Sequence, residues 1–111
     1  MKDWIVSGKT GEVYAEVDIR QNEGIEYCYT GEIVGYNFTS ELADLIDEYD
    51  ELVSECALSL LDEVEEKIYS YDLKLKILDK RIFSPSIKQK KTITFFTKYP
   101  TGNGFVDTHP F

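Results

Sequence analysis

The side chains with the clearest chemical potential are carboxylates crowded into eight consecutive positions. They are Asp44, Asp47, Glu48, Asp50 and Glu51, and hard cations such as Ca²⁺ prefer oxygen ligands of this kind. A calcium-binding loop, however, holds its ligands on a turn with a central glycine, whereas this run has no glycine and lies in a helical pattern. We therefore expect these carboxylates to form a solvated helix face and to bind no metal.

Nucleophiles and phosphate-binding sequences are equally sparse. Cys28 and Cys56 fit neither a metal-ligand spacing nor a disulfide scaffold, and no base is placed to form a thiolate. His109 is the only histidine and is the third residue from the end of the sequence. The sequence SGKT at 7–10 matches the end of a P-loop, but Asp3 stands where that motif needs its first glycine. We predict no catalytic residue and no cofactor.

Alternation of apolar and polar residues predicts five strands. The clearest covers residues 12–20, and β-rich segments at 4–6 and 25–34 flank it across turn-like sequences. Residues 69–77 and 91–99 predict a fourth and a fifth strand, with a loop at 84–86 between them. Along 12–20, one side is expected to face the core and the other the solvent; the solvent side holds Tyr14, Glu16, Asp18 and Arg20.

Residues 39–66 predict one long amphipathic helix. Thr39 or Ser40 can cap it, and no Gly or Pro interrupts it. The stretch 53–56 is weakest by helix propensity and is the expected position of any kink or break. Apolar residues recur at helical spacing along one side, at Leu42, Ile46, Tyr49, Val53, Cys56, Ala57, Leu60 and Val64.

The order β-β-β-α-β-β predicts a single α+β domain over residues 1–111. A mainly antiparallel sheet of about five strands carries the helix on one face, and residues 100–111 form a loose tail or a short edge strand. No apolar run approaches the length of a membrane span or a signal peptide. We expect a cytoplasmic protein with no membrane partner.

Charge is divided unevenly along the chain. Residues 1–66 hold 18 acidic and three basic side chains, whereas residues 67–111 hold three acidic and nine basic ones. The net charge of −9 disfavours nucleic acids and anionic lipids as partners and favours a basic protein.

The predicted helix has an acidic face without counter-ions. No Lys or Arg occurs between Glu41 and Glu66, although Glu–Lys pairs four residues apart stabilise an ordinary surface helix. Repeated like-charge pairs instead cost about 1 to 2.5 kcal/mol in all. The face serves solubility, is neutralised by lysines of the C-terminal third, or docks a basic partner. The carboxylates predicted to bind that partner are Glu41, Asp44, Glu48, Glu51, Glu55 and Asp62.

A second acidic surface is predicted on the sheet. Tyr14, Glu16 and Asp18 alternate with the apolar side of their strand and are expected to face outward together. Tyrosine supplies contact area with few rotatable bonds and a hydroxyl for the partner. These three residues are therefore an alternative partner-binding surface.

With 111 residues and a net charge of −9, the chain resembles the small acidic bacterial immunity proteins of contact-dependent and polymorphic toxin systems. Many of those proteins bind a basic nuclease domain. The resemblance implies a stoichiometric toxin inhibitor, or antitoxin, without enzymatic activity. Lys or Arg side chains of the toxin would bind the carboxylates through charge-assisted hydrogen bonds.

Three other functions are weighed against this one. In a self-associating subunit, the basic C-terminal strands of one copy would meet the acidic helix of another. A small enzyme subunit would need a cleft that contains a buried carboxylate or a thiolate-like cysteine. Basic and aromatic residues alternate near the C-terminus as in proteins that bind single-stranded nucleic acid, but the net charge disfavours that function.

Overall fold

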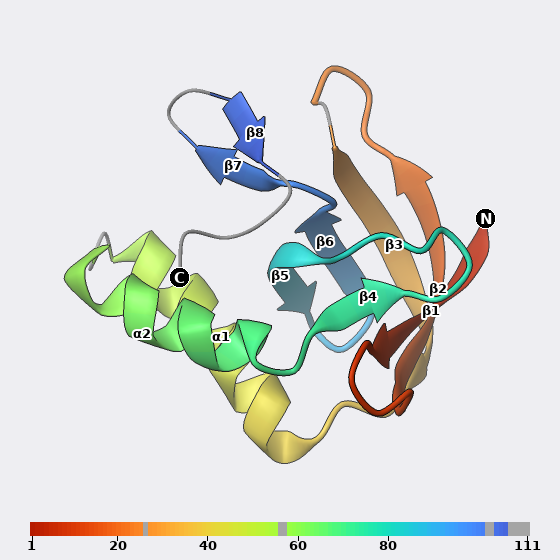
Figure 1. The fold of residues 1–111 in the computed structure, drawn as a ribbon, viewed down its shortest axis with the longest axis horizontal. Helices are drawn as coiled ribbons and strands as arrows, with labels where there is room; N and C mark the ends of the chain where they lie inside the picture. The colour runs from red at the N-terminus through yellow and green to blue at the C-terminus, as the bar shows by residue number, and fades with distance from the viewer. Residues whose placement is uncertain (26, 56–57, 102–103, 107–111) are drawn as a thin grey trace.

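The computed structural model, which describes residues 1–25, 27–55, 58–101 and 104–106, is an α+β fold with a curled antiparallel sheet and two helices (Figure 1). The six-stranded sheet has the order β4-β1-β2-β3-β6-β5. Its strands are β1 (Lys2–Ser7), β2 (Val13–Gln21), β3 (Cys28–Tyr36), β4 (Leu73–Leu75), β5 (Phe83–Lys88) and β6 (Thr92–Phe96). The helices are α1 (Ser40–Ser54) and α2 (Leu58–Tyr69), and a separate hairpin contains β7 (Tyr99–Thr101) and β8 (Gly104–Val106). The α+β class is confirmed.

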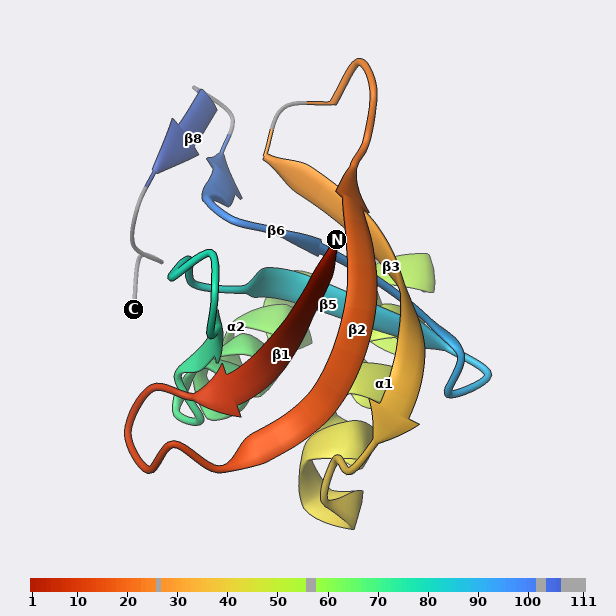
Figure 2. The same cartoon turned by 90° about the vertical axis from the view of Figure 1, so that its right-hand side faces the viewer.

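The predicted antiparallel meander is present as β1, β2 and β3. Figure 2 shows how far this sheet curls. Residues 80–82, which lead into β5, also hydrogen-bond to β4: the Ile82 N–H donates to the Leu73 carbonyl at 2.9 Å, and the Leu75 N–H donates to the Lys80 carbonyl at 2.8 Å. The two edges of the sheet are therefore connected through residues 80–82.

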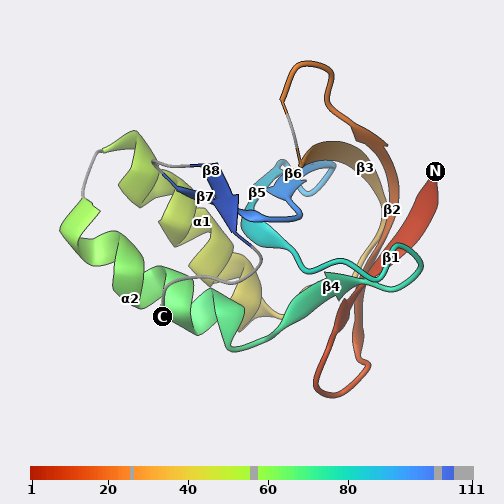
Figure 3. The same ribbon diagram turned by 45° about the horizontal axis from the view of Figure 1, so that its top comes forward.

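The single long helix predicted over 39–66 is wrong, because two helices take its place. Thr39 caps α1 as expected, since its Oγ1 accepts from the Leu42 N–H at 3.2 Å. α1 ends at Ser54, within the stretch 53–56 where a break is expected, and α2 runs back alongside it (Figure 3). An unbroken helix of this length would extend about 40 Å, beyond the roughly 30 Å spanned by a nine-residue strand. The reversal lets both helices pack on the same sheet.

The predicted apolar side of the helix is correct near the sheet and wrong near the break. Leu42, Ile46 and Val64 are buried, whereas Val53 and Leu60 are exposed. Val53 and Leu60 flank the reversal between the helices, and the positions that would continue the stripe, Cys56 and Ala57, lie outside the described residues. The helical periodicity applies to each helix separately because the chain direction changes between them.

The predicted C-terminal strands also differ from the structure. The fourth strand is limited to β4, because Tyr69 ends α2 and Tyr71 lies in the following turn. The predicted loop at 84–86 lies inside β5, where the pairing with β6 is interrupted between Phe83 and Ser86. A bulge of this kind tolerates Pro85, since no N–H is needed there. β7 and β8 occupy part of the predicted tail, and residues 107–111 lie outside the described residues.

The predicted outward orientation of Tyr14 is wrong. Val13 pairs with Val6 and Ala15 pairs with Ile5, so Tyr14 is an extra residue in β2 opposite β1. This bulge interrupts the alternation: Tyr14 is only 4% exposed, whereas Val13, predicted to face the core, is 41% exposed. The Tyr14 ring stacks on Phe38 at a centroid distance of 6.0 Å. Tyr14 is thus a core residue.

A single core joins the inner side of the sheet to the two helices. β1, β2 and β6 contribute Ile5, Val17 and Ile93, while α1 and α2 contribute residues at helical spacing. The helical members that are fully buried or nearly so are Leu42, Ile46, Val64 and Ile68. Their burial sets the rotation of each helix about its axis and so determines which side chains reach solvent.

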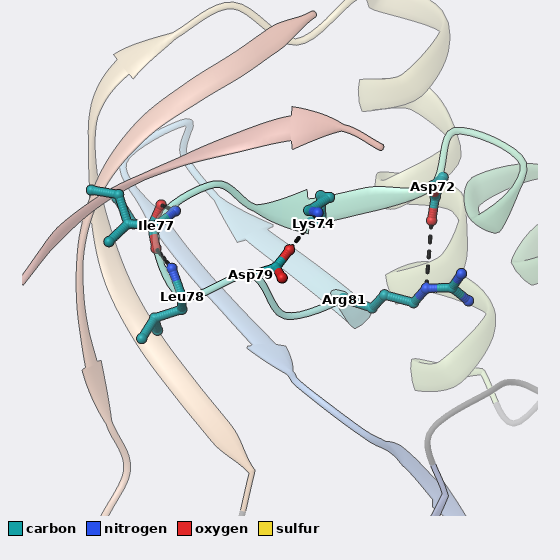
Figure 4. Close-up of polar contacts among 7 residues, drawn as sticks. Asp72, Lys74, Ile77, Leu78, Asp79 and Arg81 are labelled. Carbon is teal, nitrogen blue, oxygen red and sulfur yellow. Dashed lines mark hydrogen bonds and ion pairs between the residues drawn. The ribbon is translucent and has the colours of Figure 1, made fainter. Parts of the chain in front are cut away.

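The turn after β4 depends on one buried carboxylate, that of Asp3, which has 0% exposure. Its Oδ1 accepts from the N–H groups of Trp4 (2.7 Å) and Ile77 (2.8 Å), and its Oδ2 accepts from the Leu78 N–H at 3.0 Å. Figure 4 shows this hairpin with the exposed Lys74–Asp79 pair beside it. Asp3, which rules out the P-loop motif in the sequence, therefore has a structural role.

We expect Asp3→Asn to lower the free energy of unfolding by about 1 to 3 kcal/mol, because an amide NH₂ would replace the oxygen that faces the Leu78 N–H. Asp79→Asn is the matched control on the exposed side of the same hairpin and should cost clearly less, because substitutions at exposed positions change stability little. Urea unfolding of both variants measures the difference. Equal losses would show that Asp3 does not hold the turn.

Candidate functional site

The outer side of α1 carries the best candidate for a functional surface. Because Leu42 and Ile46 point into the core, the carboxylates on the opposite side of α1 face solvent. All of them are exposed. We call this set the α1 acidic face; it consists of Glu41, Asp44, Glu48, Glu51 and Glu55.

The α1 acidic face has no counter-ion within the described part of the chain. The ion pairs that α1 and α2 do make there are Asp50–Lys88 and Glu63–Lys67, each at 3.5 Å, and neither involves the face. Other basic side chains are engaged elsewhere: Lys74 pairs with Asp79, and Lys76 lies over the Trp4 ring. Among the residues that the structure describes, no lysine of the same molecule therefore forms an ion pair with the α1 acidic face.

Asp62 does not belong to the same face. The sequence places it with Glu41 to Glu55 on one continuous helix, but the reversal puts Asp62 on α2. It is exposed there, on a helix with its own orientation. The prediction of one acidic face that includes Asp62 is wrong for this reason.

The second predicted surface, on the sheet, is not assembled. Tyr14 is buried and Glu16 is half-buried. Asp18 is exposed but accepts a hydrogen bond from the N-terminal ammonium of Met1 at 2.8 Å. This hydrogen bond, together with the positive charge of the ammonium, lowers the pKa of Asp18. The structure therefore does not bring Tyr14, Glu16 and Asp18 together as an open surface.

A groove of about 400 Å³ adjoins the α1 acidic face. It lies between α1, the end of β3 and the turn that joins β5 to β6. Sequence reasoning missed it because its walls come from distant segments. We call it the α1 groove; its lining is Tyr36, Phe38, Ser40, Ala43, Asp44, Asp47, Ile87, Gln89 and Lys90.

The turn between β5 and β6 places the side chain of Lys90 over this groove. Gln89 and Lys90 have φ values of 54° and 57°, and the Lys91 N–H donates to the Lys88 carbonyl at 2.9 Å. This is a type I′ turn, which usually contains Asn or Gly at these positions. The turn places the Lys90 Nζ 5.3 Å from the centroid of the Tyr36 ring.

A buried carboxylate, Glu65, forms a separate polar cluster. Glu65 is only 5% exposed, and its Oε2 accepts from the Tyr99 hydroxyl at 2.8 Å. The Tyr49 hydroxyl donates to Ser84 Oγ at 3.3 Å, and the Ser84 N–H donates to the Tyr69 hydroxyl at 3.2 Å. Glu65 therefore ties β7 to α2 and lines none of the larger cavities among the described residues.

The tyrosines of this cluster keep their hydroxyl protons to a higher pH than free tyrosine does. Burial raises the pKa values of Tyr49, Tyr69 and Tyr99, and the negative charge of Glu65 adds to each increase. No sequence pattern separates Glu65 from its exposed acidic neighbours, although it lies one residue after the buried Val64. The Oε2 of Glu65 makes a structural hydrogen bond with the Tyr99 hydroxyl.

Of the remaining sequence candidates, only Cys28 lies within the described residues. Cys28 is buried and its Sγ accepts a hydrogen bond from Asn22 Nδ2 at 3.1 Å, whereas Cys56 and His109 lie outside the described residues. Within the described ranges, no group of three His, Cys, Asp or Glu residues could hold a metal ion. No described helix is both long enough and apolar enough to cross a membrane.

Comparison with known proteins finds no match among family models, curated protein sequences or solved structures. The functional assignment of this chain therefore depends on its own geometry and charge.

We expect the free energy of unfolding to fall as the pH rises above about 10, the ordinary tyrosine pKa. The pKa values of Tyr49, Tyr69 and Tyr99 are raised in the folded protein, so the stability they contribute is complete below that pH and is lost as the pH rises toward their folded values. Glu65→Gln should make this loss shallower. The exposed Glu66→Gln is the control, and equal slopes in a urea–pH series would contradict this role of Glu65.

Proposed function

We propose that this protein is a non-enzymatic binding module that occludes a basic protein partner with the α1 acidic face. The observation that carries the proposal is the set of five exposed carboxylates on one side of α1 without an ion pair among the described residues. Their mutual repulsion costs stability in the free protein. A basic partner relieves that repulsion and adds charge-assisted hydrogen bonds.

The partner class follows from the charge of the surface. A nuclease or another toxin that acts on nucleic acid needs a basic cleft to bind phosphates. An acidic helix face can enter such a cleft and compete with the nucleic acid for the same Lys and Arg side chains. We therefore propose an immunity or inhibitor function in the bacterial cytoplasm, which agrees with the resemblance in size and charge to bacterial immunity proteins.

Self-association is a less favourable alternative. It requires free cations on the C-terminal strands, and four of the lysines in this part of the chain already contact a carboxylate or an aromatic ring of the same chain: Lys74, Lys76, Lys88 and Lys90. Sedimentation over a range of salt concentrations tests it directly. A monomer at every salt concentration excludes it, and an oligomer that dissociates as salt rises would favour it over the inhibitor.

Charge reversal of the α1 acidic face should abolish capture of a basic partner. The variant carries Glu48→Lys, Glu51→Lys and Glu55→Lys, and the matched control carries Glu12→Lys, Glu23→Lys and Glu32→Lys, which are exposed residues outside both helices. Both change the net charge equally. The unmodified protein and both variants serve as baits in a lysate of the source organism at low salt, and mass spectrometry identifies what each retains.

The unmodified protein and the control should retain the same basic protein, while the helix variant loses it and associates at least about tenfold more slowly when the purified pair is measured. If the helix variant captured the basic protein as well as the unmodified protein does, use of the α1 acidic face would be refuted. Retention of no basic protein by any bait would refute the proposed function itself.

A further inference from the structure

The α1 groove combines an aromatic floor with two carboxylates. Tyr36 and Phe38 lie side by side with ring centroids 5.3 Å apart, and Asp44 and Asp47 line the wall that α1 provides. The negative charges of Asp47 and Asp44 add to the effect of burial in raising the pKa of Tyr36, which agrees with their closeness to this ring. An aromatic face beside carboxylates favours an organic cation.

The charges of the lining do not balance. Asp44 and Asp47 provide two negative charges and Lys90 provides one positive charge. Lys90 lies over the Tyr36 ring, and neither aspartate forms an ion pair among the residues that the structure describes. The groove therefore has one uncompensated negative charge and enough volume to hold one more cationic side chain.

We propose that the α1 groove is the receptor for one arginine side chain of the basic partner. A guanidinium is planar and weakly hydrated, so it can stack on an aromatic ring while its edges donate to carboxylates. An ammonium is a compact, strongly hydrated charge and makes fewer of these contacts together. The volume of about 400 Å³ holds a side chain with part of its backbone.

The groove continues the α1 acidic face, because Asp44 belongs to both. The face attracts a basic surface over a distance, and the groove fixes one residue of that surface in a defined position. The inference depends on the proposed function only for the identity of the protein that carries the arginine. Binding of an arginine side chain can be measured without that protein.

The probe is N-acetyl-L-arginine amide, titrated into the ¹⁵N-labelled protein and followed by amide chemical shifts. We expect saturable shifts at Ala43, Asp47, Gln89 and Lys90 with millimolar affinity. N-acetyl-L-citrulline amide has nearly the same shape without the charge and should give no saturable shift. The corresponding lysine amide should bind more weakly than the arginine probe.

Three variants test the lining. Asp47→Asn should weaken arginine binding by about threefold or more, whereas Asp62→Asn makes the same change on an exposed part of α2 outside the groove and should leave it unchanged. Lys90→Gln should strengthen binding by about threefold, since it removes the cation that now occupies the Tyr36 ring. Both groove positions are exposed, so the fold should tolerate the changes.

The inference is overturned if the arginine probe gives no saturable shift at the groove, if citrulline or lysine amide binds as tightly, or if Asp47→Asn and Asp62→Asn have equal effects. Arginine binding in the groove without capture of any basic protein would leave the site standing and refute the proposed function. Capture of a basic protein without arginine binding would refute the groove as an arginine receptor and leave the proposed function standing.

Discussion

The fold depends on burial of the apolar sides of α1 and α2 against the inner side of the curled sheet. Leu42 and Ile46 from α1, with Val64 and Ile68 from α2, share one core with residues of β1, β2 and β6. This packing fixes the rotation of each helix. Because the acidic residues of α1 alternate with its apolar ones at helical spacing, burial of one set exposes the other. The α1 acidic face is thus a direct consequence of how the core is built.

Basic and acidic side chains differ in whether they contact a partner within the same chain. Basic side chains of the C-terminal segments make local contacts, such as Lys74 with Asp79 and Lys90 with Tyr36, whereas the α1 acidic face contacts no cation within the described ranges. Two other carboxylates, Asp3 and Glu65, are buried and hydrogen-bonded. Structural and solvent-facing acids are therefore separated in space, and the α1 acidic face and the adjoining groove are exposed, as the proposed docking of a basic partner requires.

Local periodicity was enough to predict the class of fold, the first three strands and the orientation of Leu42 and Ile46. It failed where the local geometry changes. The bulge at Tyr14 interrupts the alternation at the start of β2, and the reversal after Ser54 moves Asp62 to another helix. The groove and the Glu65 cluster join segments distant in the sequence. No pattern within a single segment contains that information.

Zero-length carbodiimide cross-linking of the isolated protein tests the central claim most directly, because it couples only carboxylates and amines that are already in contact. Mass spectrometry should find links between Asp50 and Lys88 and between Glu63 and Lys67, which form ion pairs. It should find none from the α1 acidic face. Links that join Glu48, Glu51 or Glu55 to lysines of the same molecule would contradict the account, since those carboxylates would then be neutralised without a partner.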